Sequence, residues 1–204
     1  METARILTVQ PFSISPQELK AAVGKKGKPL DPKEAMAGAN PFYNGGAQGN
    51  FTENCQRAVV AYELRRRGYD VIALPTYSND KLPAGGRWQG AFRKAKRINV
   101  GSTSPKRTQA NLEAQMKSYG NGARGIVTIP GHAFNVENIN GKIRYIDAQT
   151  NTVYNSNNVF SRLGRKSANV SLIRTDNLRV SERAKKSVTP STKLVKDIAS
   201  RKKK

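Results

Sequence analysis

The sequence has one cysteine, one histidine and no long apolar run, and each shortage excludes a class of protein or site. Its 204 residues include one cysteine, so no internal disulfide can hold the fold together. One cysteine and one histidine are too few for a Cys/His zinc cluster within a single chain. No run approaches the roughly 18 apolar residues of a membrane-spanning helix, and residues 1–19 lack the pattern of a secretory signal. We therefore expect no membrane span and a fold suited to the cytoplasm.

Positive charge is what the chain has in excess. Thirty-six lysines and arginines face 14 aspartates and glutamates, which gives a net charge of +22. Residues 152–204 carry 14 basic and 3 acidic residues, so half of the net charge lies in the last quarter of the chain. A segment of this kind is typically solvated and attracts polyanions such as nucleic acid.

The hydrophobic pattern divides the chain into three segments. Residues 1–39 contain two helix-start patterns, Ser15-Pro16-Gln17-Glu18 and Asp31-Pro32-Lys33-Glu34, and are expected to form a helical extension. Residues 40–155 carry the strongest periodicity and are expected to form the main domain. Residues 156–204 are expected to form a basic, partly disordered extension.

The middle segment predicts an α+β domain. Residues 52–67 have the spacing of an amphipathic helix, with apolar side chains at Cys55, Ala58, Val59 and Tyr62. Asn140-Gly141 is the preferred dipeptide of a type I′ turn, and it joins predicted strands over residues 132–138 and 142–148. A helix followed by antiparallel strands is typical of the α+β class.

The single cysteine, Cys55, lies in the first turn of the predicted helix. Backbone N–H groups and the helix dipole stabilise a thiolate at this position, and the thiolate is the nucleophilic form of cysteine. A lone cysteine on an apolar helix face is also well suited to be a small core residue. Its position alone therefore supports both interpretations.

The single histidine, His132, opens the first strand of the predicted hairpin. In the register that the turn imposes, His132 faces Gln149 and has Asp147 as its diagonal neighbour. A base oriented by a carboxylate or an amide, beside an activatable thiol, is the arrangement used in covalent catalysis. The alternative is a half-buried structural histidine, with Asp147 in a turn or an ion pair.

Several motifs between residues 40 and 152 follow one another in the order cysteine, histidine, aspartate. They are Asn54-Cys55-Gln56-Arg57, the stretch from Tyr62 to Val71, Gly122-Ala123-Arg124-Gly125, Gly131-His132-Ala133-Phe134-Asn135-Val136 and Asp147-Ala148-Gln149-Thr150. In this order they resemble the papain-fold toxin family, whose members occur in bacterial polymorphic toxins and in phage head-associated proteins. The resemblance implies a papain-like α+β fold, with the nucleophile at a helix N-terminus packed against an antiparallel sheet.

The resemblance also implies a role for each motif residue. Cys55 corresponds to the nucleophile, His132 to the base and Asp147 to the orienting group, while Gln149 matches the family's second polar position in that strand. The implied enzyme is a cysteine hydrolase of protein amide bonds, either a protease or a glutamine deamidase, which needs no metal or organic cofactor. The side chains that could donate to the oxyanion precede the nucleophile and are Gln48, Asn50 and Asn54. The Cys55 backbone N–H is also expected to contribute.

The family context implies further partners and locations. These are a protein substrate and, beside it, an immunity protein or phage head proteins. The chain would then be delivered into a target cell or packaged in a virion.

The positive charge supports a second function, that of a nucleic-acid-binding or virion-associated protein that keeps the papain-like fold. Phosphate contacts would be non-specific, because the sequence contains no recognised DNA or RNA module. A solvated surface explains the same charge equally well. The residues expected to contact a polyanion are Arg65, Arg66, Arg67, Lys94, Lys96, Arg97, Lys185, Lys186, Arg201, Lys202, Lys203 and Lys204.

Overall fold

The computed structural model describes residues 20, 23–43, 50–76, 88–155 and 159–193. The α-helices are α2 (Pro32–Ala39), α3 (Cys55–Arg66) and α4 (Pro105–Ser118), and the 3-10 helices are η1 (Trp88–Ala91), η3 (Ser161–Asn169) and η4 (Glu182–Lys186). The strands are β1 (Val71–Ala73), β2 (Ile98–Asn99), β3 (Arg124–Ile129), β4 (His132–Ile139), β5 (Lys142–Asp147), β6 (Thr152–Tyr154), β7 (Ser171–Arg174) and β8 (Val188–Pro190). Within these segments no helix has the length and apolarity that crossing a bilayer requires.

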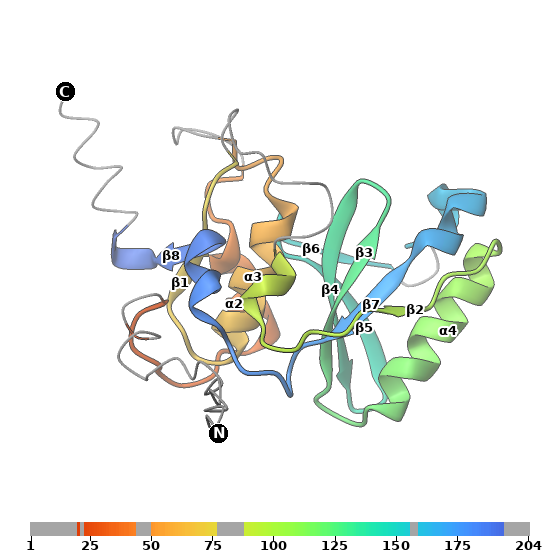
Figure 1. Cartoon of the computed structure of the whole chain (residues 1–204), viewed down its shortest axis with the longest axis horizontal. Coiled ribbons are helices and arrows are strands. Elements are labelled where there is room, and N and C mark those ends of the chain that lie inside the picture. The colour runs from red at the N-terminus through yellow and green to blue at the C-terminus, as the bar shows by residue number, and fades with distance from the viewer. Residues whose placement is uncertain (1–19, 21–22, 44–49, 77–87, 156–158, 194–204) are drawn as a thin grey trace, which may run out of the picture.

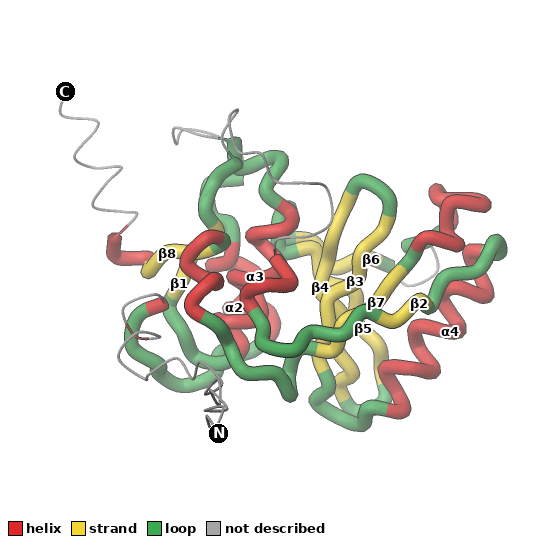
Figure 2. Tube along the Cα trace, in the orientation of Figure 1, coloured by secondary structure: helices red, strands yellow, loops and turns green. Residues whose placement is uncertain are grey.

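The strands form two antiparallel sheets (Figure 1). The larger has the order β2-β7-β3-β4-β5-β6, and the smaller pairs β1 with β8. Helices α2 and α3 lie on one side of the larger sheet, and α4 lies on the other (Figures 1 and 2). The predicted α+β class is confirmed.

Alternating side chains of the central strands build a core on each face of the sheet. Ile126, Ala133 and Ile146 pack in the cluster that includes α2 and α3. Their chain neighbours Val127, Phe134 and Tyr145 pack in the cluster that includes α4. A period of two therefore buries both faces, as it must when helices cover a sheet on each side.

Helix α2 begins where the sequence predicts. The Asp31 carboxylate accepts hydrogen bonds from the backbone N–H groups of Lys33 and Glu34, at 2.8 and 2.9 Å. Pro32 follows the cap, where its missing N–H costs no hydrogen bond. The earlier helix start expected at residues 15–18 lies outside the described residues.

The predicted β4–β5 hairpin is confirmed. Asn140 and Gly141 have φ angles of 52° and 81°, as a type I′ turn requires. The ladder between the two strands keeps the predicted register but ends at Asn135 and Ile146. His132 therefore does not face Gln149 in this ladder. It pairs instead with β3, because a two-residue turn joins β3 directly to β4.

The C-terminal quarter contributes to both sheets. Strand β7 lies inside the larger sheet, between β2 and β3, and β8 pairs with β1 (Figure 1). Leu172 and Ile173 of β7 are buried, one in each core. The described part of residues 156–204 is thus integral to the fold, although its charged composition predicts an appendage. The end of that segment, residues 194–204, lies outside the described residues.

Candidate active site

Cys55 is the first residue of α3. Its thiol is free and half-buried, and it packs against the core on the α3 side of the sheet. The preceding residue, Asn54, occupies the N-cap position, but its side chain caps no helix N–H. The sulfur therefore lies at the positive end of the helix dipole, which favours an anionic sulfur.

Helix α3 and strand β4 run side by side in the same direction. The Asn135 side-chain amide donates to the carbonyl oxygen of Val59 at 3.1 Å. One turn further along the helix, the Tyr62 hydroxyl donates to Glu137 at 2.8 Å. Because the two elements are aligned in this way, the beginning of α3 lies near the beginning of β4. This alignment brings the only cysteine of the chain to the only histidine.

His132 and Asp147 are in contact. Their Nε2 and Oδ2 atoms are 2.9 Å apart, and the side chains are 22% and 1% exposed. His132 begins β4 and Asp147 ends β5, so the antiparallel pairing places both at the same end of the sheet. The other carboxylate oxygen, Oδ1, accepts the backbone N–H groups of Gln149 and Thr150 at 3.0 and 3.4 Å.

These contacts change the proton affinity of both groups. Burial by itself lowers the pKa of His132, but hydrogen bonds to Asp147 and Cys55 and the charge of both outweigh it and raise the pKa to about 9. Burial raises the pKa of Asp147, but the hydrogen bond and charge of His132, and hydrogen bonds from Tyr154 and Gln149, hold it below its ordinary value. The imidazole is therefore a cation at neutral pH. Because Nε2 of His132 contacts Asp147, Nδ1 is the ring nitrogen that remains to interact with Cys55.

Tyr154 is part of the site, although the sequence motifs did not include it. Its hydroxyl donates to Oδ2 of Asp147 and lies 3.4 Å from Nε2 of His132. It reaches them from β6, where Thr152 pairs with Asp147 and Tyr154 is the diagonal neighbour. The sequence could have indicated Tyr154, because a strand that directly follows the Asp147–Thr150 motif pairs with β5.

Asn40, the residue after α2, links the two halves of the site. Its side-chain amide donates to the carbonyl oxygens of Phe51 and Gln149, at 3.0 and 2.9 Å. Its side-chain oxygen accepts from the Asn54 amide at 2.9 Å. One buried side chain therefore connects the residue before the cysteine to the loop after Asp147.

The side chains expected to serve as oxyanion donors have different surroundings. The Asn54 amide donates one hydrogen to Asn40 and another to the carbonyl oxygen of Leu74, at 3.0 Å, so both of its hydrogens are engaged. The Asn50 side-chain oxygen accepts from the backbone N–H of Thr52 at 2.8 Å. Gln149 is buried, and Gln48 lies outside the described residues.

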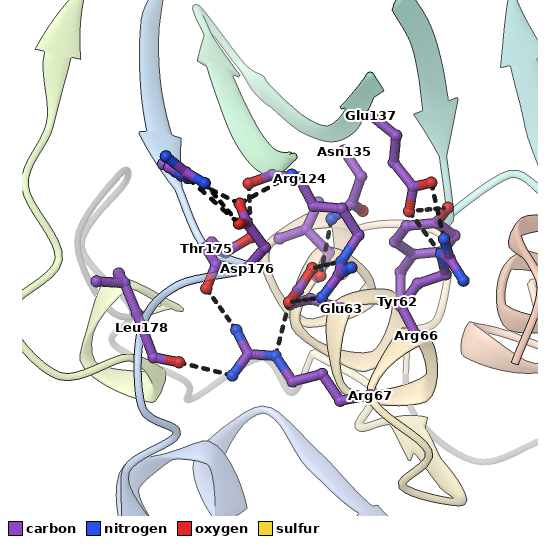
Figure 3. Close-up of polar contacts among 12 residues, drawn as sticks. Tyr62, Glu63, Arg66, Arg67, Arg124, Asn135, Glu137, Thr175, Asp176 and Leu178 are labelled. Carbon is purple, nitrogen blue, oxygen red and sulfur yellow. Dashed lines mark hydrogen bonds and ion pairs between the residues drawn. The ribbon is translucent and has the colours of Figure 1, made fainter. Parts of the chain in front are cut away.

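The arginines at the end of α3 have partners inside the protein. Arg66 contacts Glu137 and Arg67 contacts Glu63, each at 2.7 Å (Figure 3). Arg65 contacts Asp70 at 3.0 Å. These contacts do not favour phosphate binding by the same three side chains. Of the other residues expected to contact a polyanion, Arg201 to Lys204 lie outside the described residues, and the exposed ones are Lys94, Lys96, Arg97, Lys185 and Lys186. Polyanion binding stays a prediction.

The side chains of this site do not resemble a metal centre. Among the described residues, no group of three or more histidine, cysteine, aspartate or glutamate side chains is placed to hold a metal ion. The arrangement instead joins a thiol, an imidazolium and a buried carboxylate. This is the chemistry of a nucleophile, a proton carrier and an orienting group.

Comparison with known proteins agrees with this arrangement. A family model described as papain fold toxin 1, glutamine deamidase, matches residues 53–152. The matched segment contains Cys55, His132 and Asp147 and ends two residues before Tyr154. No curated protein and no solved structure matches the chain significantly. The family model and the α+β fold confirm the predicted resemblance: residues 53–152 match the papain-fold toxin family.

Proposed function

We propose that the protein is a toxin-type cysteine hydrolase that deamidates glutamine side chains of a target protein. Cys55 is the nucleophile, His132 carries the proton and Asp147 orients the imidazole. The observation that carries the proposal is that the His132 imidazole contacts the Asp147 carboxylate at 2.9 Å and also interacts with Cys55. The family description favours glutamine as the substrate group.

In the proposed cycle the reactive form is a Cys55 thiolate beside the His132 imidazolium. The Cys55 sulfur attacks the side-chain carbonyl carbon of the glutamine, and the carbonyl oxygen becomes an oxyanion. In this mechanism the backbone N–H of Cys55, at the start of α3, donates to that oxygen. His132 then gives its proton to the leaving nitrogen, the C–N bond breaks, and ammonia departs.

Hydrolysis completes the cycle. The remaining thioester is attacked by water, whose proton passes to the now neutral imidazole of His132. The C–S bond breaks, and the product glutamate leaves the thiolate and the imidazolium as they were at the start. Asp147 stays ionised throughout, because its low pKa keeps it a hydrogen-bond acceptor.

The first prediction concerns the reaction product. Target proteins treated with the wild-type chain should gain about 1 Da at individual glutamines, since an amide NH2 is replaced by OH. Mass spectrometry of a proteome exposed to wild type, to Cys55→Ala and to Asp147→Asn measures the change. Cleaved chains in place of the mass gain would indicate a protease, and identical products from wild type and Cys55→Ala would contradict the proposed nucleophile.

Alkylation of Cys55 tests the site without a known substrate. The wild-type thiol should react quickly with iodoacetamide below pH 7, and His132→Ala should slow the reaction by at least about tenfold, because the thiolate loses its cation. The measurement is unambiguous, since the chain has one cysteine. A slow reaction that His132→Ala does not change would show that Cys55 is an ordinary core thiol.

A further inference from the structure

We propose that Tyr154 is a positioning residue of this site, whose hydroxyl competes with His132 for one oxygen of Asp147 and so limits how firmly His132 holds its proton. The inference rests on the proposed function, because it concerns the proton that the reaction must move. It is carried by the hydrogen bonds around Asp147.

The Asp147 carboxylate is fully engaged. Its Oδ1 atom accepts two backbone N–H groups from the turn that follows β5. Its Oδ2 atom accepts both the Nε2 proton of His132 and the hydroxyl proton of Tyr154. With Oδ1 anchored by the backbone and the side chain 1% exposed, the carboxylate has little freedom to turn. The two donors on Oδ2 therefore share the same negative charge.

Tyr154 is held in place to make this contact. Its ring meets the Phe134 ring edge-on, with centroids 5.7 Å apart and an interplanar angle of 89°. Burial, then the neighbouring Asp147 and, more weakly, Cys55 and Tyr43 raise the pKa of Tyr154. The hydroxyl therefore remains a hydrogen-bond donor throughout the pH range in which a histidine titrates.

The sharing has a consequence for catalysis. An imidazolium that faces an unshared carboxylate is a weaker acid, because the carboxylate stabilises its proton. The His132 imidazolium must hold its proton before the reaction and must release it to the leaving nitrogen during the reaction. By taking part of the charge on Oδ2, the Tyr154 hydroxyl keeps His132 a better proton donor than Asp147 alone would allow.

The chain offers a clean experiment, because it has a single histidine and a matched control tyrosine. Tyr145 pairs directly with Tyr154 across β5 and β6, and its ring also lies against Phe134, at 6.3 Å. Its hydroxyl, however, donates to Glu113 on α4 at 3.0 Å and takes no part in the site. Tyr145→Phe therefore also removes a phenolic oxygen from a ring that packs against Phe134, and it leaves the hydrogen bonds of Asp147 unchanged.

The measurement is the NMR titration of the His132 ring in wild type, Tyr154→Phe and Tyr145→Phe. Wild type should titrate near pH 9. Tyr154→Phe should move the midpoint upward by about half a pH unit or more, because Oδ2 is released to the imidazolium. Tyr145→Phe should leave it unchanged. In an Asp147→Asn background, Tyr154→Phe should have no effect, since the residue acts through the carboxylate.

The outcomes separate the two proposals. A wild-type histidine that titrates near pH 6.5, together with slow alkylation of Cys55, would contradict the proposed function itself. A wild-type midpoint near 9 that Tyr154→Phe leaves in place or lowers would overturn only the role of Tyr154. So would an upward shift that persists in the Asp147→Asn background, because it would mean a direct effect across the 3.4 Å to His132.

Discussion

The pair formed by His132 and Asp147 couples the site to the stability of the protein. Both groups are charged at neutral pH, and both lie among buried neighbours that an unfolded chain would not supply. Each therefore binds protons differently in the folded and unfolded states. The free energy of unfolding must then depend on pH in the range where each group titrates.

We expect His132 to stabilise the folded state at neutral pH and to stop doing so in alkaline solution. Its folded pKa of about 9 lies above the ordinary value of 6.5, so its contribution is fully present below pH 6.5 and is lost as pH rises through about 9. For Asp147, whose folded pKa is below 3.8, the contribution is present above that value and is lost in acid. Urea unfolding of wild type and His132→Gln from pH 6 to 10 measures the first effect.

The sign of the His132 effect is specific. The difference in unfolding free energy between wild type and His132→Gln should shrink with rising pH, by at most about 1.4 kcal/mol per pH unit, since one proton is involved. Comparing the two variants cancels the groups that titrate in both. A difference that is constant from pH 6 to 10 would mean that His132 is neutral in the folded protein.

At the scale of elements, buried ion pairs fasten α3 to the larger sheet. Glu63 of α3 contacts Arg67 at 2.7 Å and Arg124 of β3 at 2.9 Å (Figure 3). Glu137 of β4 contacts Arg66 of α3 at 2.7 Å. Both carboxylates are 1% exposed or less, so the charges are paired in a place where an unpaired charge would be costly. The network thus sets the position of the helix that carries Cys55.

Removal of one carboxylate from this network should be strongly destabilising. Glu137→Gln keeps the size of the side chain but leaves Arg66 without its carboxylate, and we expect a loss of about 3 to 5 kcal/mol in unfolding free energy. Asp70→Asn is the matched control, because it breaks an ion pair of the same helix in which the Asp70 side chain is 67% exposed. It should cost less than about 1 kcal/mol. Chemical denaturation compares the two, and equal losses would contradict the anchoring role.

At the scale of the whole molecule, the chain returns to complete both sheets. Strand β7 supplies hydrogen-bond partners to β2 and β3, and β8 supplies them to β1. After β7, the carbonyl oxygens of Thr175 and Leu178 accept hydrogen bonds from the Arg67 guanidinium (Figure 3). The segment that follows β7 therefore also contacts the end of α3. The C-terminal quarter is therefore expected to fold together with the site rather than apart from it.

Truncation measures this interdependence. A chain that ends at residue 155 lacks β7 and β8, and it should lose cooperative unfolding and the dispersed NMR spectrum of a packed core, because the middle of the larger sheet is left unpaired. A chain that ends at residue 193 keeps every described element and should retain both properties. A folded, active chain ending at residue 155 would restore the domain boundary that the sequence predicts there.

The sequence by itself determined the local structure and the chemical identity of the site. The Asp31 cap, the Asn140-Gly141 turn and the placement of Cys55 at a helix start follow from short-range backbone geometry, and each was predicted. The order of Cys55, His132 and Asp147 was enough to indicate the family. Each of these motifs consists of a few consecutive residues, so it can be recognised without knowing the fold.

The tertiary structure decided what depends on partners far apart in the chain. Asn40 and the pairing of Arg66 with Glu137 have no local signature, because each acts on a residue that other strands or helices bring close. The same holds for β7, whose four residues are too short and too polar at their ends to predict a central strand. A buried charge, a shared hydrogen bond and a strand inserted between two others are stable only in the assembled fold, so only that fold identifies them.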